Sequence, residues 1–265
     1  MIEIAIALAV IAFALVAIIG VLPTGLTVQK DNREDTIINQ DGPYWLETIR
    51  TGSKGLDHLT NYVETITINT LGPGVDDTII YTNSPNAPQP VPYDGSMSNG
   101  QRIVGLLTTP KYFFDATFQR FTNTITARVR ALTGAAVEQG IANPEFAFSY
   151  VLMPEIVPFS GVKFDYQSTN YCDPAILGDP AEVARRQAKW VEIKTRELNT
   201  SEIRLNFRWP LLAKENVAAN VLTNRPGPNR QSFRAIASGE QKVTDGLTFF
   251  EPQSFTLAPP PPPCP

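Results

Sequence analysis

Few side chains in this sequence have the types and spacing that could do chemistry. The chain contains one histidine, His58, and two cysteines, Cys172 and Cys264. A single imidazole argues against Ser-His-Asp catalysis and against a metal site built from several histidines. No nucleophile elbow or phosphate-binding glycine loop is present, and nothing marks Asp76 and Asp77 as a catalytic pair. The sequence therefore predicts no enzyme activity, no cofactor and no metal site, and it places His58 at the surface.

The carboxylate of Glu3 stands out because a long apolar run follows it. From Ile4 to Leu22, nineteen consecutive residues carry no charge. At about 1.5 Å per residue, such a helix nearly spans a hydrocarbon core of roughly 30 Å. A cleaved secretory signal would have a basic front and a small-x-small cleavage site, which Met-Ile-Glu and Val-Leu-Pro-Thr-Gly-Leu do not supply. A plain membrane anchor explains the run and leaves Glu3 at the water interface, where the helix dipole favours a carboxylate.

The opening "MIEIAIALAVIAFALVAIIG" resembles the N-terminal helix of type IV pilins and pseudopilins. In that family the mature chain begins with a methylated residue, usually Phe, followed by Thr-Leu-Ile-Glu and a long apolar run. Met1-Ile2-Glu3 match the third to fifth positions of the family pattern, so either two residues are absent before Met1 or the mature N-terminus is two residues shorter than in the family. The stretches "NGQRIVGLLTTPKY" and "RLNFRWPLL" are similar, less specifically, to larger bacterial pilin-like proteins.

The resemblance implies a structural subunit of an extracellular type IV pilus-like filament, anchored in the inner membrane before assembly. Its partners would be copies of itself, the pilus assembly machinery and a prepilin peptidase that removes a basic leader. In the filament core, Glu3 would pair with the N-terminal amine of a neighbouring subunit, because a lone buried carboxylate is costly. A pseudopilin of a type II secretion system and a membrane-anchored periplasmic enzyme or binding protein are the alternatives.

Pro23 and Gly25 follow the apolar run and raise two interpretations. A proline inside a helix removes a backbone hydrogen bond and clashes with the preceding turn. Either the membrane helix ends here, or, as the resemblance implies, the helix kinks or locally melts when it packs in a filament. The second interpretation is favoured because the following "TVQKDNREDTIINQ" is still compatible with a helix.

A disulfide between Cys172 and Cys264 is expected. Cys264 lies in the closing "PPPPPCP", an extended polyproline segment that would wander if it were not tied down. Many pilins close their C-terminal region with a disulfide, so the resemblance adds weight. The alternatives are two unpaired thiols or a cross-link between chains.

The sequence predicts an α+β architecture, with a long N-terminal helix packed against an antiparallel sheet as in pilins. The expected parts are an apolar transmembrane or filament-core half (residues 1–25), the remainder of the helical spine (26–55) and a head with a Pro-rich tail (56–265). The helix should stop near Asn39 or Gln40, because Gly42-Pro43 is a strong break. A short helix should then run from Pro43 to Gly52, and another helical turn or two should follow Leu56.

Strands should dominate the rest of the chain. Residues 72–101 are predicted to be loop around one strand. In 123–132 and 202–209, apolar and polar residues alternate with period two, which is typical of an antiparallel sheet packed on one face. Segment 178–198 is ambiguous between a helix from Pro180 and a strand. Residues predicted as strands are 78–82, 102–109, 123–132, 146–153, 202–209 and, as the last one, 232–238.

Charge and modification signals are weak. The net charge is −4, so the bulk charge gives no indication of a nucleic-acid or anionic-membrane partner. Arginines on the polar strand faces could form a basic patch, but such faces are more often solvated or meet acidic neighbours in an assembly. Asn199 in Asn-Thr-Ser is a possible acceptor for N-glycosylation.

Overall fold

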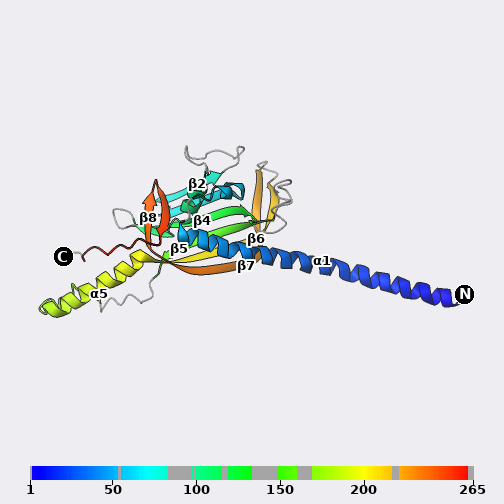
Figure 1. Ribbon diagram of the computed structural model, residues 1–265, viewed down its shortest axis with the longest axis horizontal. Coiled ribbons are helices and arrows are strands. Elements are labelled where there is room, and N and C mark those ends of the chain that lie inside the picture. Colours follow the sequence, from blue (N-terminus) through cyan, green and yellow to red (C-terminus); the bar gives the residue numbers. More distant parts are fainter. Residues whose placement is uncertain are drawn as a thin grey trace.

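The computed structural model describes residues 2–52, 55–82, 97, 99–114, 119–132, 148–159, 169–216 and 221–261, without the side chains at 21, 24, 114 and 212–225. It is an α+β fold in which a long apolar N-terminal helix leads into a head built on an antiparallel sheet (Figure 1). The two chain ends lie toward opposite ends of the long axis. The predicted fold class is therefore confirmed at this level.

The first helix, α1, runs unbroken over Ile2–Thr51 and passes through Pro23 and Pro43. The predicted stop near Gln40 is wrong. Pro43 removes one backbone hydrogen bond, but Ile38, Trp45 and Ile49 on either side of it are fully buried against the sheet. This packing holds the helix together across the proline. The predicted end is confirmed, because Gly52 takes a left-handed φ of 57° and its N–H bonds to the carbonyl of Ile49.

The main sheet has the strand order β2-β1-β4-β5-β6-β7, with the short strand β3 added beside β4, and every pairing between these strands is antiparallel. A 3-10 helix, Asp57–Asn61, precedes the sheet where one or two helical turns were predicted. The helical prediction fails beyond it, because Ile66 and Ile68 alternate with threonines and form a strand. The strands are β1 (Val63–Gly72), β2 (Val75–Thr82), β3 (Tyr112–Phe114), β4 (Arg120–Arg130), β5 (Ser149–Pro158), β6 (Thr200–Asn216) and β7 (Val221–Ser238).

The strand predicted at 102–109 is instead the helix α2, Gly100–Leu107. The Asn99 side chain caps it by accepting a hydrogen bond from the N–H of Arg102, 2.8 Å away. Ile103, Leu106 and Leu107 then fall on one buried helical face. An apolar run of this length fits a strand or a buried helix equally well, and the cap at Asn99 decides between them.

Strand β7 is not the last, because the hairpin β8 (Glu240–Thr244) and β9 (Leu247–Glu251) follows it. Asp245 and Gly246 form its two-residue turn, both with positive φ. An Asp-Gly pair between strand-like segments is the usual signal of such a turn.

Segment 178–198, for which the sequence left helix and strand open, is a helix, α5 (Pro180–Asn199), with Asp179 as its cap and Pro180 in its first turn.

One face of the main sheet, called the inner face, carries the core of the head. The second half of α1, α2 and the β8–β9 hairpin contact this side. The predicted alternation is confirmed: the apolar residues of β4 and β6 are buried on the inner face and their polar neighbours lie on the opposite, outer face. Buried inner-face residues of these strands are Ile125, Ala127, Val129, Ile203, Leu205, Phe207 and Trp209.

Candidate assembly surface

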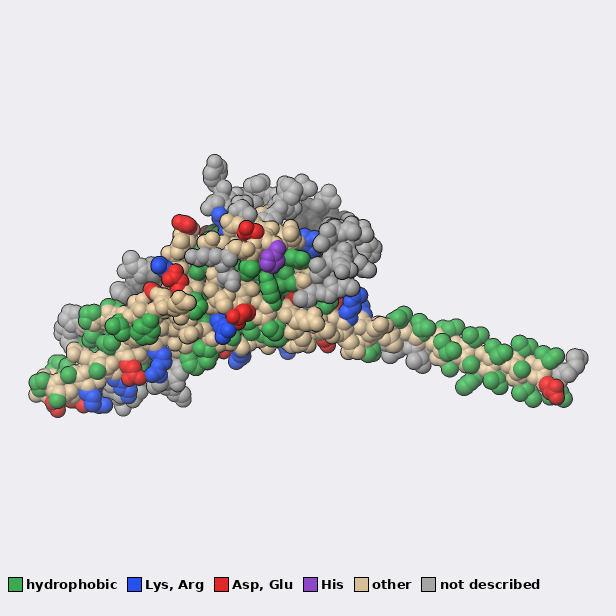
Figure 2. Space-filling model, in the orientation of Figure 1, with side chains coloured by type: hydrophobic (Ala, Val, Ile, Leu, Met, Phe, Trp, Pro, Cys, Tyr) green, Lys and Arg blue, Asp and Glu red, His purple; other side chains and the backbone are tan. Residues whose placement is uncertain are grey.

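The N-terminal part of α1, Ile2–Val28, extends away from the head as a rod covered with apolar side chains, and we call it the apolar rod (Figure 2). Its large apolar side chains are between 52% and 79% exposed. They are Ile2, Ile4, Ile6, Leu8, Val10, Ile11, Phe13, Leu15, Val16, Ile18, Ile19, Leu22, Leu26 and Val28. A helix that is apolar all round must be surrounded by apolar matter on every side, as in a membrane or a helix bundle.

By length and composition, α1 is the one helix in the described part of the chain that could cross a membrane. A secretory signal near an N-terminus would pass the same test. Fully burying a large apolar side chain is worth about 1.5–3 kcal/mol. Covering the whole apolar rod would therefore be worth on the order of 20 kcal/mol, which exceeds the stability of most domains.

Glu3 lies in the first turn of α1 and is the only charged residue before Lys30. Its side chain is exposed, and within the described residues it has no ion pair. A carboxylate at this end of a helix interacts favourably with the helix dipole. If the apolar rod were buried among other helices, the same carboxylate would need a positive partner from outside this chain.

Pro23 and Gly25 both lie inside the continuous helix. Pro23 cannot donate to the carbonyl four residues earlier, and the Thr27 hydroxyl bonds back to the Pro23 carbonyl at 3.0 Å. A Cβ atom at Gly25 would meet no atom within 4 Å. The interpretation that the helix ends here is wrong for the single chain. Kinking or melting inside a filament stays a prediction.

The second half of α1 joins the sheet through a buried polar network that sequence reasoning missed. Asp41 is fully buried, and its Oδ2 accepts hydrogen bonds from the Tyr150 hydroxyl and from the Leu132 N–H, each at 2.9 Å. The Trp45 Nε1–H donates to the same Tyr150 hydroxyl at 2.9 Å. Burial, together with the nearby Asp41 charge, raises the pKa of Tyr150 well above its usual value, so the phenol remains a donor.

Gly42 lets α1 approach β7 closely. A Cβ atom here would clash with the ring of Phe233, so a larger residue would force either this ring or the helix to shift. Beside this contact, Gln231 Nε2 donates to Asn39 Oδ1 at 2.7 Å. In the sequence, the Asp41-Gly42 pair lies between apolar residues of this helix. The pair alone indicates a helix stop and does not reveal the buried contacts.

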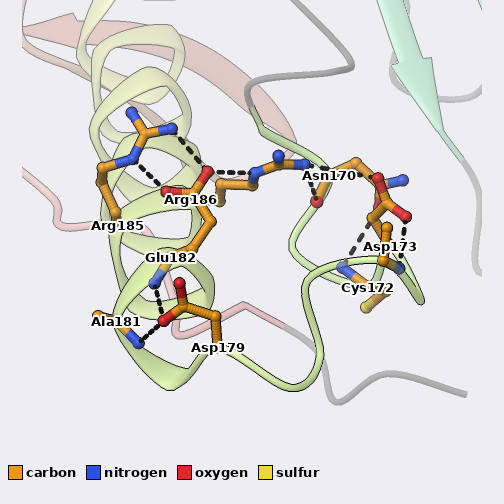
Figure 3. A network of polar contacts seen from close by, with 9 residues as sticks. Asn170, Cys172, Asp173, Asp179, Ala181, Glu182, Arg185 and Arg186 are labelled. Carbon is orange, nitrogen blue, oxygen red and sulfur yellow. Dashed lines mark hydrogen bonds and ion pairs between the residues drawn. The ribbon is translucent and has the colours of Figure 1, made fainter.

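At the other end of the molecule, α5 contacts residues 170–176, which we call the Cys172 segment (Figures 1 and 3). Glu182 accepts hydrogen bonds from the guanidinium groups of Arg185 and Arg186, which lower the pKa of this carboxyl to about 2. Arg186 also donates to the Asn170 carbonyl at 3.1 Å and lies 3.7 Å from the Asp173 carboxylate. The Cys172 segment is thus fixed to the first turns of α5.

Cys172 forms a disulfide, and its predicted partner, Cys264, lies outside the described residues. The C-terminal tail runs back along α5: the Thr256 N–H bonds to Asn199, and the Ala258 N–H bonds to the Thr195 hydroxyl. The pairing of Cys172 with Cys264 stays a prediction.

Asn199 does not fit the role of a glycosylation site in the folded head. It is 4% exposed, and its amide nitrogen, the atom that would carry a glycan, already donates to the carbonyls of Thr195 and Thr256. Its oxygen accepts from the Thr256 N–H. Asn199 is therefore a buried residue that holds the C-terminal tail by hydrogen bonds. The Asn-Thr-Ser sequence by itself does not show whether the asparagine is buried.

The other chemically active side chains are dispersed. His58 is exposed, as predicted, and its Nε2 lies 3.0 Å from the Tyr44 hydroxyl. Among the described residues, no group of three or more His, Cys, Asp or Glu side chains could hold a metal ion. Comparison of the chain with protein-family models, with curated proteins and with solved structures finds no match.

Proposed function

We propose that this chain is the structural subunit of an extracellular type IV pilus-like filament. The observation that carries the proposal is the apolar rod: it is long enough to cross a membrane, apolar on every side and unpacked, while the head buries its own core without it. A structure with one such rod and one self-sufficient head suits a polymer whose core is a bundle of rods. The opening residues, which resemble those of pilins, point the same way.

In this proposal the apolar rod first lies in the inner membrane, after a prepilin peptidase has removed a leader. The assembly machinery then moves it from lipid into the helix bundle, so its apolar surface stays covered throughout. Glu3 would pair with the N-terminal amine of a neighbouring copy, which offsets the cost of placing a carboxylate among apolar helices. The head would remain outside the bundle, in water.

Two alternatives share the exposed rod. A pseudopilin of a type II secretion system would use the same bundle in a short periplasmic filament. A membrane-anchored periplasmic enzyme or binding protein would keep the rod in lipid, with Glu3 at the interface. The alternatives differ in whether copies come off cells as filaments.

Shearing cells that carry Glu3→Ala tests the proposal. We expect the unmodified chain to appear in sheared surface filaments and Glu3→Ala to reduce filament yield at least tenfold, while the chain still accumulates in the membrane. Asp31→Ala, which removes an exposed carboxylate of α1 beyond the apolar rod, should leave the yield unchanged. Normal yield from Glu3→Ala would remove the pairing role, and the absence of sheared filaments from the unmodified chain would favour the plain anchor.

A further inference from the structure

The main sheet has two open margins. Among the described residues, β2 pairs only with β1 and β7 pairs only with β6, and these strands lie at opposite margins of the head (Figure 1). An edge strand presents a row of backbone N–H and C=O groups that another strand can pair with. Pro226 and Pro228 in β7 suit an edge position, because proline cannot donate to a ladder. The stretch Asn229–Ser238 is free of proline.

The two margins carry opposite charge. Strand β2 contains Asp76 and Asp77 and no lysine or arginine, whereas β7 contains three arginines and no acidic residue. Within the described residues, neither aspartate has an ion pair, and both are exposed. Arg230 is likewise exposed and has no ion pair there, and Arg234 reaches the Glu202 carboxylate only at 3.9 Å. Each margin therefore offers charges that a partner of opposite sign could neutralise.

Charges on edge strands commonly serve to prevent aggregation. Protection of that kind works with one sign on both edges, because every copy then repels every other. Here only like edges repel each other. The negative charges of β2 repel those of a second β2, and the positive charges of β7 repel those of a second β7. A contact between β7 and the β2 of a second copy is attractive. Such a contact joins two different surfaces, so it leaves a free edge on each copy and can extend through a chain of copies instead of closing as a two-fold dimer.

Strand direction also suits this contact. Successive strands along the path from β2 to β7 alternate in direction, so β2 and β7 run opposite ways. A neighbouring head that points the same way therefore presents β2 antiparallel to β7, the pairing used throughout this sheet. A bundle of parallel apolar rods requires that all heads point the same way.

We propose that neighbouring heads in the filament join edge to edge, with β7 of one copy pairing with β2 of the next as antiparallel strands. This proposal rests on the filament proposed above. Outer-face residues then meet in the register Asp76 with Arg234, Thr78 with Ser232 and Ile80 with Arg230. One ion pair and one pair of small hydroxyl residues lie opposite each other, and opposite charges across strands are stabilising.

A cysteine cross-link tests the contact in the full chain. Thr78 and Ser232 are exposed and small, and we expect Thr78→Cys with Ser232→Cys to give a ladder of covalent oligomers in sheared filaments without reductant. Five strand spacings of about 4.8 Å separate these positions within one chain, roughly 24 Å, which is beyond disulfide range. Thr124→Cys on the outer face of β4, combined with Ser232→Cys, is the matched control and should give no ladder beyond that of the unmodified chain.

Charge exchange gives a second measurement. We expect Asp76→Lys to lower filament yield severalfold and Arg234→Asp in the same chain to restore it, because the exchange rebuilds the pair with reversed signs. Filaments without a ladder, together with no effect of either charge change, would overturn the edge contact and leave the filament itself standing. The absence of filaments from the unmodified chain would overturn both proposals.

Discussion

At the scale of single residues, the Asp41 carboxylate fixes where α1 meets the sheet. It is fully buried and accepts hydrogen bonds from the Tyr150 hydroxyl and the Leu132 backbone, while Trp45 holds the same phenol. A buried polar group is tolerated only when its partners are in place. Sliding the helix by one turn would strand this carboxylate in the core, so the network selects one position along the sheet.

Tyr150→Phe tests this role. The change removes one donor from a buried carboxylate and should lower the free energy of unfolding by about 1–3 kcal/mol. Tyr112→Phe removes only the hydroxyl of an exposed tyrosine of β3, and it should change stability by less than about 0.5 kcal/mol. Urea denaturation of both variants and of the unmodified chain gives the comparison. Equal effects of the two changes would contradict a special role for the buried network.

At the scale of elements, α5 and the tail form one unit with the Cys172 segment. The pKa of Glu182, about 2, lies below its ordinary value of 4.5 because the Arg185 and Arg186 guanidinium groups bond the charged form. A carboxyl whose pKa is lowered on folding stabilises the fold above its ordinary pKa, and that contribution disappears as the pH falls toward 2. The attachment of the Cys172 segment should thus survive mild acid.

Glu182→Gln should loosen the first turns of α5 and the Cys172 segment at neutral pH. The protection factors of the amide hydrogens in 170–176, which correct for the intrinsic pH dependence of exchange, should fall severalfold in this variant. In the unmodified chain these protection factors should fall only as the pH is lowered from about 4.5 toward 2. Glu192→Gln removes a single exposed pair with Arg196 farther along the same helix and serves as the control. Exchange that is unchanged in Glu182→Gln would show that Asp173 and the disulfide hold the segment without this carboxylate.

The elements also show how far sequence reasoning reached. The alternating strands β4 and β6 were predictable because their period-two pattern directly states which face is buried. The continuity of α1 through Pro43 was not, because it depends on contacts with a sheet that follows much later in the chain. The same holds for Asp41, whose partners Leu132 and Tyr150 are about 90 to 110 residues away. Glu3 was found because its signal is entirely local.

At the scale of the whole molecule, the apolar rod and the head are separable in their packing. Burial on α1 begins at Glu34, where burial raises the pKa of the carboxyl despite the nearby Lys30, and it continues through Ile49. None of the side chains described before that point contributes to the core of the head.

A fragment beginning at Val28 should therefore be soluble, folded and monomeric at micromolar concentrations. A single edge contact between β7 and β2 buries too little to hold two heads together once the rods are removed. Light scattering and circular dichroism of the fragment check both points, and the full chain in detergent serves as the reference. If the fragment polymerises by itself, the bundle of rods is not the core of the assembly.

The unbroken course of α1 has a mechanical consequence. A 50-residue helix is a rod of about 75 Å that runs without a joint from one end of the chain into the core of the head. In the proposed filament, tension would therefore pull Ile38, Trp45 and Ile49 lengthwise across the sheet. These contacts would have to break together in shear rather than one at a time. The hydrogen bonds of Asp41 and the ring of Phe233 against Gly42 would further resist sliding of the helix along the sheet. A head joined in this way should stay attached to its helix under forces that would separate contacts broken one after another.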